Sequence, residues 1–133
     1  MTLFDPIRRK SVAHTPEEGV RQAVLRYLLD VVKVPGNLIG VEFSLSALEP
    51  GNMRRADVVV WKPGGGGLEP WLLVECKAPD INITNDIALH LGFYLRKIPC
   101  PYLMLSNGKD TFYLARDGAG YKAVPALPIF SVL

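Results

Sequence analysis

Two stretches of the chain are apolar enough to be strands buried in a sheet, yet each carries charge at one end. Residues 55–61 read Arg-Ala-Asp-Val-Val-Val-Trp, and residues 71–77 read Trp-Leu-Leu-Val-Glu-Cys-Lys. Charged side chains are seldom buried unless they are paired, bound to a ligand or used in chemistry. This placement of charge constrains the fold and the function of the chain more than any other feature of its sequence.

The two strands are predicted to form an antiparallel hairpin, joined by a flexible connection at residues 62–70 that contains four consecutive glycines. In such a hairpin, Asp57 near the start of the first strand lies beside Glu75 near the end of the second. Because side chains alternate along a strand, Glu75 and Lys77 project from one face and Cys76 from the other. Two carboxylates and one ammonium group are therefore expected at one edge of the sheet.

Two carboxylates a few ångströms apart repel each other, and a divalent cation relieves the repulsion. Mg²⁺ binds one or two carboxylates together with waters and phosphate oxygens. The sequence therefore suggests a metal site formed by Asp57, Glu75 and the backbone carbonyl of Cys76. Lys77 would position or help to deprotonate an attacking water, which suits the hydrolysis of a phosphodiester bond. The alternative is a salt bridge at the margin of the sheet, in which one carboxylate pairs with Lys77 or Arg55.

The remaining pattern predicts a mixed α/β fold, with a sheet flanked by helices. A helix is expected from residue 15 to about residue 34, because a Thr-Pro-Glu-Glu capping sequence precedes apolar side chains at helical spacing. A second helix is expected over about residues 83–97. Further strands are expected at residues 41–46, 102–106, 111–115 and 121–124. Strands and helices in this order fit a mixed sheet with helices packed against it.

Length and composition exclude several classes of protein. The 133 residues suit a single domain, with its core at about residues 15–115, and leave no room for a motor domain. The net charge of +2 is too small to indicate a nucleic-acid binder by itself. The two cysteines lie far apart and have no zinc-site spacing, and Cys76 is expected to be a small buried apolar residue. A cytoplasmic protein without a membrane segment or a secretory signal is expected.

Several motifs occur in the order that is typical of one nuclease family. Asp57 followed by Glu75-Cys76-Lys77 matches the PD-(D/E)xK nuclease motif, without the proline that precedes the aspartate. The match extends to Glu42 and to residues 16–22, 54–60, 72–79 and 105–108. From about residue 15 to residue 115, the chain resembles the N-terminal nuclease domain of type I restriction enzyme R subunits.

The resemblance implies a restriction-endonuclease-like fold and a DNA-cleaving activity that depends on Mg²⁺ or Mn²⁺. It also implies that a glutamate from the first helix joins the metal site. Glu18 is assigned to this role, and Glu17 is the alternative. A capping box would compete with the role, because a Glu18 side chain folded back onto the N–H of Thr15 cannot also reach a metal.

Four further residues are candidates for auxiliary roles. Related nucleases carry a Gln-x-x-x-Tyr pair on the helix after the Glu-x-Lys strand, and His90 and Tyr94 keep that spacing with His in place of Gln. The alternative for His90 is a half-buried histidine with an ordinary hydrogen bond. Arg21 and Gln22 are placed to contact either a phosphate or Glu42.

Three functions follow from this reading. The first is a metal-dependent endonuclease or exonuclease of a restriction–modification system. Because the helicase of type I R subunits is missing, the chain is expected to be either a stand-alone member of the family or a fragment of a longer protein. A cut in both strands would call for a homodimer. The second is a catalytically silent module that keeps the fold and binds nucleic acid or a protein partner. The third, a carboxylate-pair hydrolase acting on sugars, ranks low because such sites need no neighbouring lysine.

Overall fold

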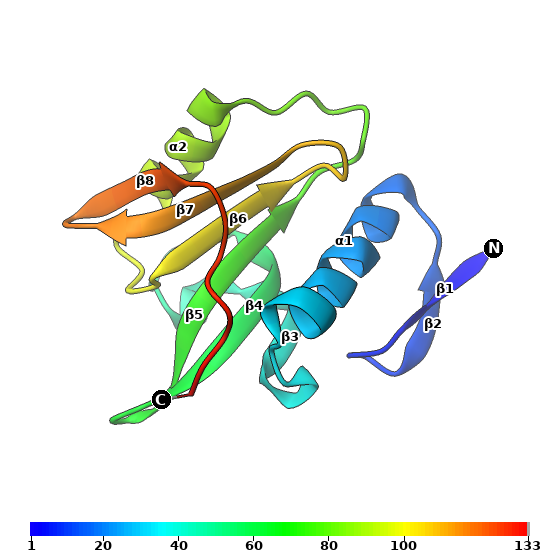
Figure 1. Cartoon of the computed structure of the whole chain (residues 1–133), viewed down its shortest axis with the longest axis horizontal. Helices are drawn as coiled ribbons and strands as arrows, with labels where there is room; N and C mark the ends of the chain where they lie inside the picture. The colour runs from blue at the N-terminus through cyan, green and yellow to red at the C-terminus, as the bar shows by residue number, and fades with distance from the viewer. Residues whose placement is uncertain (133) are drawn as a thin grey trace.

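The structure of the protein, a computed structural model, describes residues 1–132. Within these residues, a mixed six-stranded sheet has the order β3-β4-β5-β6-β7-β8, in which β5 and β6 run parallel and the other neighbours are antiparallel (Figure 1). The strands are β3 (Ile39–Ser44), β4 (Arg55–Gly64), β5 (Gly67–Cys76), β6 (Tyr102–Ser106), β7 (Thr111–Asp117) and β8 (Gly120–Val124). Helices α1 (Pro16–Tyr27) and α2 (Asn85–Tyr94) flank the sheet, and the predicted mixed α/β fold is confirmed.

β4 and β5 form the predicted antiparallel hairpin, but its tip differs from the prediction. The two strands remain paired as far as Gly64 and Gly67, with a register shift between Val60 and Trp61. The prediction of a flexible connection over residues 62–70 is therefore wrong, because cross-strand pairing overrides the low strand propensity of glycine. Gly67 has a φ of +121°, a conformation that residues with a side chain rarely adopt, so the tight turn needs a glycine there.

α1 packs over β4 and β5 on one face of the sheet. It begins as predicted: Thr15 Oγ1 accepts a hydrogen bond of 3.1 Å from the N–H of Glu18, and Pro16 occupies the first turn. After Tyr27 the helix continues as a π-helical turn, Leu28–Val32, and Lys33 ends it in the left-handed conformation with a φ of 68°. The core on this face includes Val20, Val24, Leu25, Leu28, Val58, Val60, Leu72, Val74 and Cys76, which confirms the expected burial of Cys76.

α2 packs against β6, β7 and β8 on the opposite face, over a second core that includes Val59, Leu73, Ala88, Leu91, Leu95, Leu103 and Leu114. It is shorter than the predicted helix of residues 83–97, because Thr84 caps its start and the backbone leaves the helical conformation at Leu95. Gly92 allows the helix to approach the sheet closely. A Cβ atom at this position would lie 3.1 Å from side-chain atoms of Leu114 and Tyr121.

Two further elements differ from the predictions. Residues 2–13 form a hairpin of β1 (Thr2–Asp5) and β2 (Lys10–Ala13), which was not predicted and lies beside α1 (Figure 1). β3 ends at Ser44, and Leu45 enters a 3₁₀ turn that buries its side chain. Of the helices described in residues 1–132, none is long and apolar enough to cross a membrane.

Candidate functional site

Asp57 lies near the start of β4, where β5 ends beside it. Its Oδ2 atom accepts a hydrogen bond of 2.7 Å from the backbone N–H of Cys76. Val58 pairs with Val74, so Asp57 and Glu75 are the next positions beyond this pair on the two strands. The fold therefore brings the Asp57 carboxylate to the backbone of the Glu-Cys-Lys segment.

Glu75 is held by two cationic side chains. Its Oε1 atom lies 2.7 Å from Nη2 of Arg54 and 3.8 Å from Nζ of Lys77. The Arg54 guanidinium also stacks on the ring of Tyr94, 4.7 Å from the ring centroid. The Lys77 side chain is more exposed than that of Arg54, with 40% of its surface accessible to solvent. Its ammonium group can therefore reach a bound molecule.

The Glu75 side chain opens toward α2, whereas Cys76 is buried in the core under α1, as strand alternation requires. A small pocket lies on this side of the sheet between α2 and the ends of β4 and β5. Its lining residues are Leu45, Arg54, Arg55, Ala56, Leu73, Val74, Glu75, Leu91 and Leu95. Glu75 and two arginines are the charged side chains that line it.

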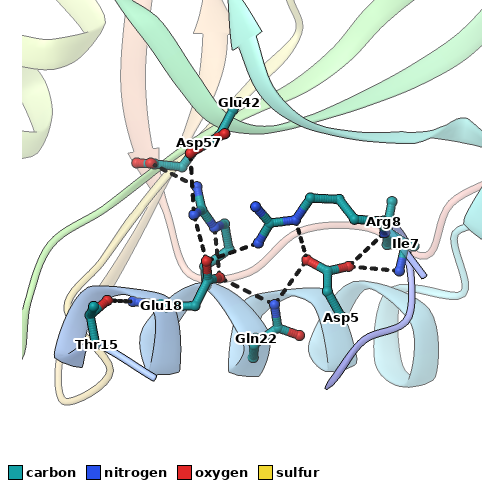
Figure 2. Close-up of polar contacts among 9 residues, drawn as sticks. Asp5, Ile7, Arg8, Thr15, Glu18, Gln22, Glu42 and Asp57 are labelled. Carbon is teal, nitrogen blue, oxygen red and sulfur yellow. Dashed lines mark hydrogen bonds and ion pairs between the residues drawn. The ribbon is translucent and has the colours of Figure 1, made fainter. Parts of the chain in front are cut away.

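Glu18 is buried on α1 and accepts hydrogen bonds from three side chains (Figure 2). Arg21 donates from Nε and Nη2 at 2.9 and 2.8 Å, Arg8 from Nη2 at 2.8 Å, and Gln22 from Nε2 at 3.2 Å. These hydrogen bonds lower the pKa of Glu18 to about 2, and the hydrogen bonding to Arg21 is the largest cause of the shift. The capping box is therefore only half formed, because the N–H of Glu18 donates to Thr15 while its carboxylate is engaged by the arginines.

Arg21 connects this buried carboxylate to the sheet. Its Nη1 lies 3.5 Å from Oδ1 of Asp57, and its Nη2 lies 3.5 Å from Oε1 of Glu42 (Figure 2). The predicted contact of Arg21 with Glu42 is therefore present, and a contact of Arg21 with a phosphate stays a prediction. Gln22 instead donates to Glu18 and, at 3.0 Å, to Asp5.

Glu42 adopts an unusual backbone conformation opposite Asp57. Val41 pairs with Val58 and Phe43 with Ala56, so Glu42 and Asp57 face each other across β3 and β4. The φ of Glu42 is +57°, in the left-handed region that disfavours residues with a side chain. This local departure from regular strand geometry lies beside the candidate site, where such strain is often found.

The environment of Asp57 disfavours its charge. Burial raises the pKa of this carboxyl group above its usual value, and the nearby charges of Glu17 and Glu75 raise it further. The hydrogen bond from Cys76 and the charge of Arg21 oppose the shift without cancelling it. Glu17 is exposed on α1 and is the carboxylate of this helix whose charge raises the pKa of Asp57.

Sequence reasoning missed two residues that contact Glu18 and Gln22. Asp5 is the last residue of β1, and Arg8 lies in the turn that follows it. Asp5 is completely buried and accepts hydrogen bonds from the backbone N–H groups of Ile7 and Arg8, from Nε of Arg8 and from Gln22. Arg8 therefore joins Asp5 to Glu18. The Asp-Pro dipeptide at residues 5–6 is a turn signal that could have marked this hairpin.

His90 and Tyr94 both lie on α2 and are exposed to solvent. The alternative of a half-buried His90 is therefore wrong. Tyr94 is connected to Glu75 through Arg54, whereas His90 has no hydrogen bond or ion pair with another residue in the described part of the chain.

The residues that could hold a metal are few. Among residues 1–132, no group of three or more His, Cys, Asp and Glu side chains is arranged to hold a metal ion. Asp57 and Glu75 remain as two carboxylates, but Asp57 contacts Arg21 of α1, whereas Glu75 contacts Arg54 and lines the pocket beside α2. Oxygen donors of this kind fit Mg²⁺, which retains several waters when one or two carboxylates bind it.

A comparison with protein families gives a match to the model described as the type I restriction enzyme R protein N terminus, over residues 16–128. A comparison with curated proteins found no match. The family match covers both helices and the six-stranded sheet, and it leaves out the hairpin of β1 and β2. The chain belongs to the family of the N-terminal domain of type I restriction enzyme R proteins.

Proposed function

We propose that the protein is a nuclease that hydrolyses phosphodiester bonds of DNA with the help of Mg²⁺ or Mn²⁺. The observation that carries the proposal is the position of the Asp57 carboxylate, 2.7 Å from the N–H of Cys76 in the Glu-Cys-Lys segment. Membership of a restriction enzyme family supports DNA as the substrate. A restriction–modification role fits the same family, and a cut in both strands would require two copies of the site.

Each residue of the site has a proposed task. Asp57 would hold the cation, together with the backbone carbonyl of Cys76, and Glu75, which now pairs with Arg54 on the side of α2, would have to turn toward Asp57 to join them. Bound Mg²⁺ would supply Lewis-acid polarisation of the scissile phosphate. Lys77, whose ammonium group already lies 3.8 Å from Glu75, would position the attacking water and help to remove its proton.

The two glutamates at the start of α1 would have different tasks. Glu18 is bound by two arginines and a glutamine, which supports a role in holding Arg21 against Asp57 rather than in binding metal. Glu17 is exposed, and its charge raises the pKa of Asp57. We therefore assign the glutamate of the first helix that assists the cation to Glu17.

A cleavage assay tests this function. Supercoiled plasmid is incubated with the protein in Mg²⁺, in Mn²⁺ and in EDTA, beside the variants Asp57→Asn and Lys77→Ala. Because Asn keeps the acceptor for the N–H of Cys76, the first variant removes the charge and little else. We expect cleavage that needs the metal and falls by about 100-fold or more in both variants. Lys122→Ala, an exposed lysine on β8, is the matched control and should cleave normally.

A silent DNA-binding module is the second candidate. The guanidinium groups of Arg54 and Arg21 lie 2.7 Å from Glu75 and 3.5 Å from Asp57, and they supply positive charge to the two carboxylates without a metal. Calorimetry with Mn²⁺ alone separates the candidates. Heat of binding that disappears in Asp57→Asn supports the nuclease, whereas no binding of Mn²⁺ together with salt-sensitive retention of DNA supports the module.

A further inference from the structure

Exposed aromatic side chains are rare on this protein and two of them are neighbours. Within residues 1–132, the mostly exposed aromatic residues are Phe4, Phe93 and Tyr94, at 65%, 61% and 51% of their full accessibility. Phe93 and Tyr94 are consecutive at the C-terminal end of α2. Exposed apolar side chains by themselves are common on protein surfaces, so it is the groups around these two rings that point to a ligand.

An arginine covers each of these two rings. The guanidinium of Arg96 lies 4.1 Å from the ring centroid of Phe93 and also donates to the carbonyl of that residue at 2.8 Å. The guanidinium of Arg54 lies 4.7 Å from the ring centroid of Tyr94. No such contact is found for Phe4 among the described residues. We call Phe93, Tyr94, Arg54 and Arg96 the aromatic platform.

The aromatic platform lies next to the candidate metal site. Arg54 contacts Glu75 at 2.7 Å with the same guanidinium that stacks on Tyr94, so the platform adjoins that carboxylate directly. Arg55, which is exposed, lines the pocket between them. The surface beside Glu75 therefore combines the Tyr94 ring, flat guanidinium groups and excess positive charge. The Phe93 ring, with Arg96 over it, leaves α2 about 100° further around the helix axis.

This combination suits one class of ligand, a single strand of DNA. Unpaired bases stack on aromatic rings and on arginine planes, and the arginines attract the phosphates between the bases. Bases inside a duplex are stacked on each other and cannot use such a surface. An apolar protein segment would gain little from the two guanidinium groups that lie over the rings.

We propose that the aromatic platform binds unpaired bases of a DNA strand whose backbone passes Glu75. The position of the strand relative to the scissile bond rests on the proposed nuclease function, whereas the stacking itself does not. The substrate would then be single-stranded DNA, or duplex DNA that is locally opened.

Fluorescence anisotropy with a labelled oligothymidine tests the proposal. The measurement is made in EDTA, so that neither metal binding nor cleavage is needed, and is repeated with a duplex of the same length. We expect Phe93→Ala to weaken binding of the single strand by about tenfold and to affect the duplex much less. Phe93→Trp should restore binding, and Phe4→Ala, which removes an equally exposed ring elsewhere, should leave it unchanged.

Three results would overturn the proposal. One is unchanged binding of the single strand by Phe93→Ala and by the double variant Phe93→Ala/Tyr94→Ala, with thermal unfolding confirming that both are folded. Another is an equal loss for single strand and duplex, which would assign the effect to charge alone. The third is self-association, measured by sedimentation, that Phe93→Ala abolishes without changing DNA binding, because a second copy of the chain would then cover the rings. Loss of plasmid cleavage alone, with stacking intact, would count only against the nuclease.

Discussion

Glu18 binds Arg21 through two hydrogen bonds, of 2.8 and 2.9 Å, between consecutive turns of α1. This bidentate pairing fixes the plane of the guanidinium. Nη1 of the same group then lies 3.5 Å from Asp57, and Nη2, which also donates to Glu18, lies 3.5 Å from Glu42. One buried carboxylate on the helix therefore determines where positive charge is presented to the sheet.

The first prediction concerns the stability that Glu18 provides. Because its pKa falls from the usual 4.5 to about 2 on folding, the charged form stabilises the fold above pH 4.5, and this contribution disappears as the pH falls through about 2. We expect Glu18→Gln to lower the free energy of unfolding at about pH 7 by about 3 kcal/mol, and by far less at about pH 2.

Urea unfolding at the two pH values measures this difference. Glu17→Gln is the matched control, since Glu17 precedes Glu18 on the same helix but is exposed. An equal effect of the two substitutions at neutral pH would show that the arginine pairing contributes nothing to stability.

The hairpin of β4 and β5 and its acidic residues were predictable because their signals are local. A run of β-branched residues such as Val58, Val59 and Val60 favours a strand, and the spacing of Asp57 and Glu75 in a hairpin follows from antiparallel pairing. The site motif is readable for the same reason. Its residues lie at fixed positions on strands that are adjacent in both sequence and space.

The partners of these residues were not predictable in the same way. β1 and β2 have four residues each, which is too short for a periodic pattern, and Asp5 reaches Gln22 only through tertiary folding. Likewise, nothing local to Glu18 distinguishes a carboxylate that faces a metal from one that faces Arg8. Which charged side chains meet depends on how whole helices and strands pack together. The spacing of apolar residues along the sequence, which predicts helices and strands, does not reveal these contacts.

The second prediction concerns Asp5, which anchors the hairpin of β1 and β2. Burial raises the pKa of this carboxyl group, but hydrogen bonds from Arg8, Gln22 and Ile7 lower it more, and the net pKa is lowered. Asp5→Ala leaves these donors without an acceptor in a buried position. We expect a loss of about 3 kcal/mol in the free energy of unfolding.

Hydrogen exchange should then accelerate in residues 2–13 more than in β4 and β5, because the hairpin loses its attachment to α1 before the sheet opens. Asp30→Ala, which removes an exposed carboxylate, serves as the control. Unchanged exchange in residues 2–13 of the Asp5 variant would contradict the anchoring role.

The third prediction concerns the backbone of Glu42. A residue with a side chain at a φ of +57° carries strain that glycine does not, so Glu42→Gly should raise the free energy of unfolding by up to about 1 kcal/mol. Glu42→Gln keeps the strain while it removes the charge near Arg21, and should not stabilise the protein. Thermal unfolding of both variants tests this prediction. If Glu42→Gln also unfolds at a higher temperature than the natural chain, the charge of Glu42, and not its backbone strain, is what destabilises the fold.

The last prediction links the stability of the protein to its proposed site. The pKa of Asp57 is raised, chiefly by burial, so the protonated form favours folding below the usual pKa of 3.8, and this contribution is lost as the pH rises through the higher folded value. At about pH 7 the charged carboxylate therefore lowers the stability of the fold. Asp57→Asn should unfold at a higher temperature than the natural chain at this pH, and the two unfolding temperatures should converge in acid.

Addition of Mn²⁺ at about 100 times its dissociation constant should reverse the order of the two unfolding temperatures. Binding adds about 2.7 kcal/mol to the stability of the natural chain and nothing to that of the variant. Thermal unfolding with and without Mn²⁺ measures both effects. A natural chain that is already the more stable of the two in EDTA would mean that Arg21 and Cys76 fully compensate the buried charge, which would remove the electrostatic reason for a cation at Asp57.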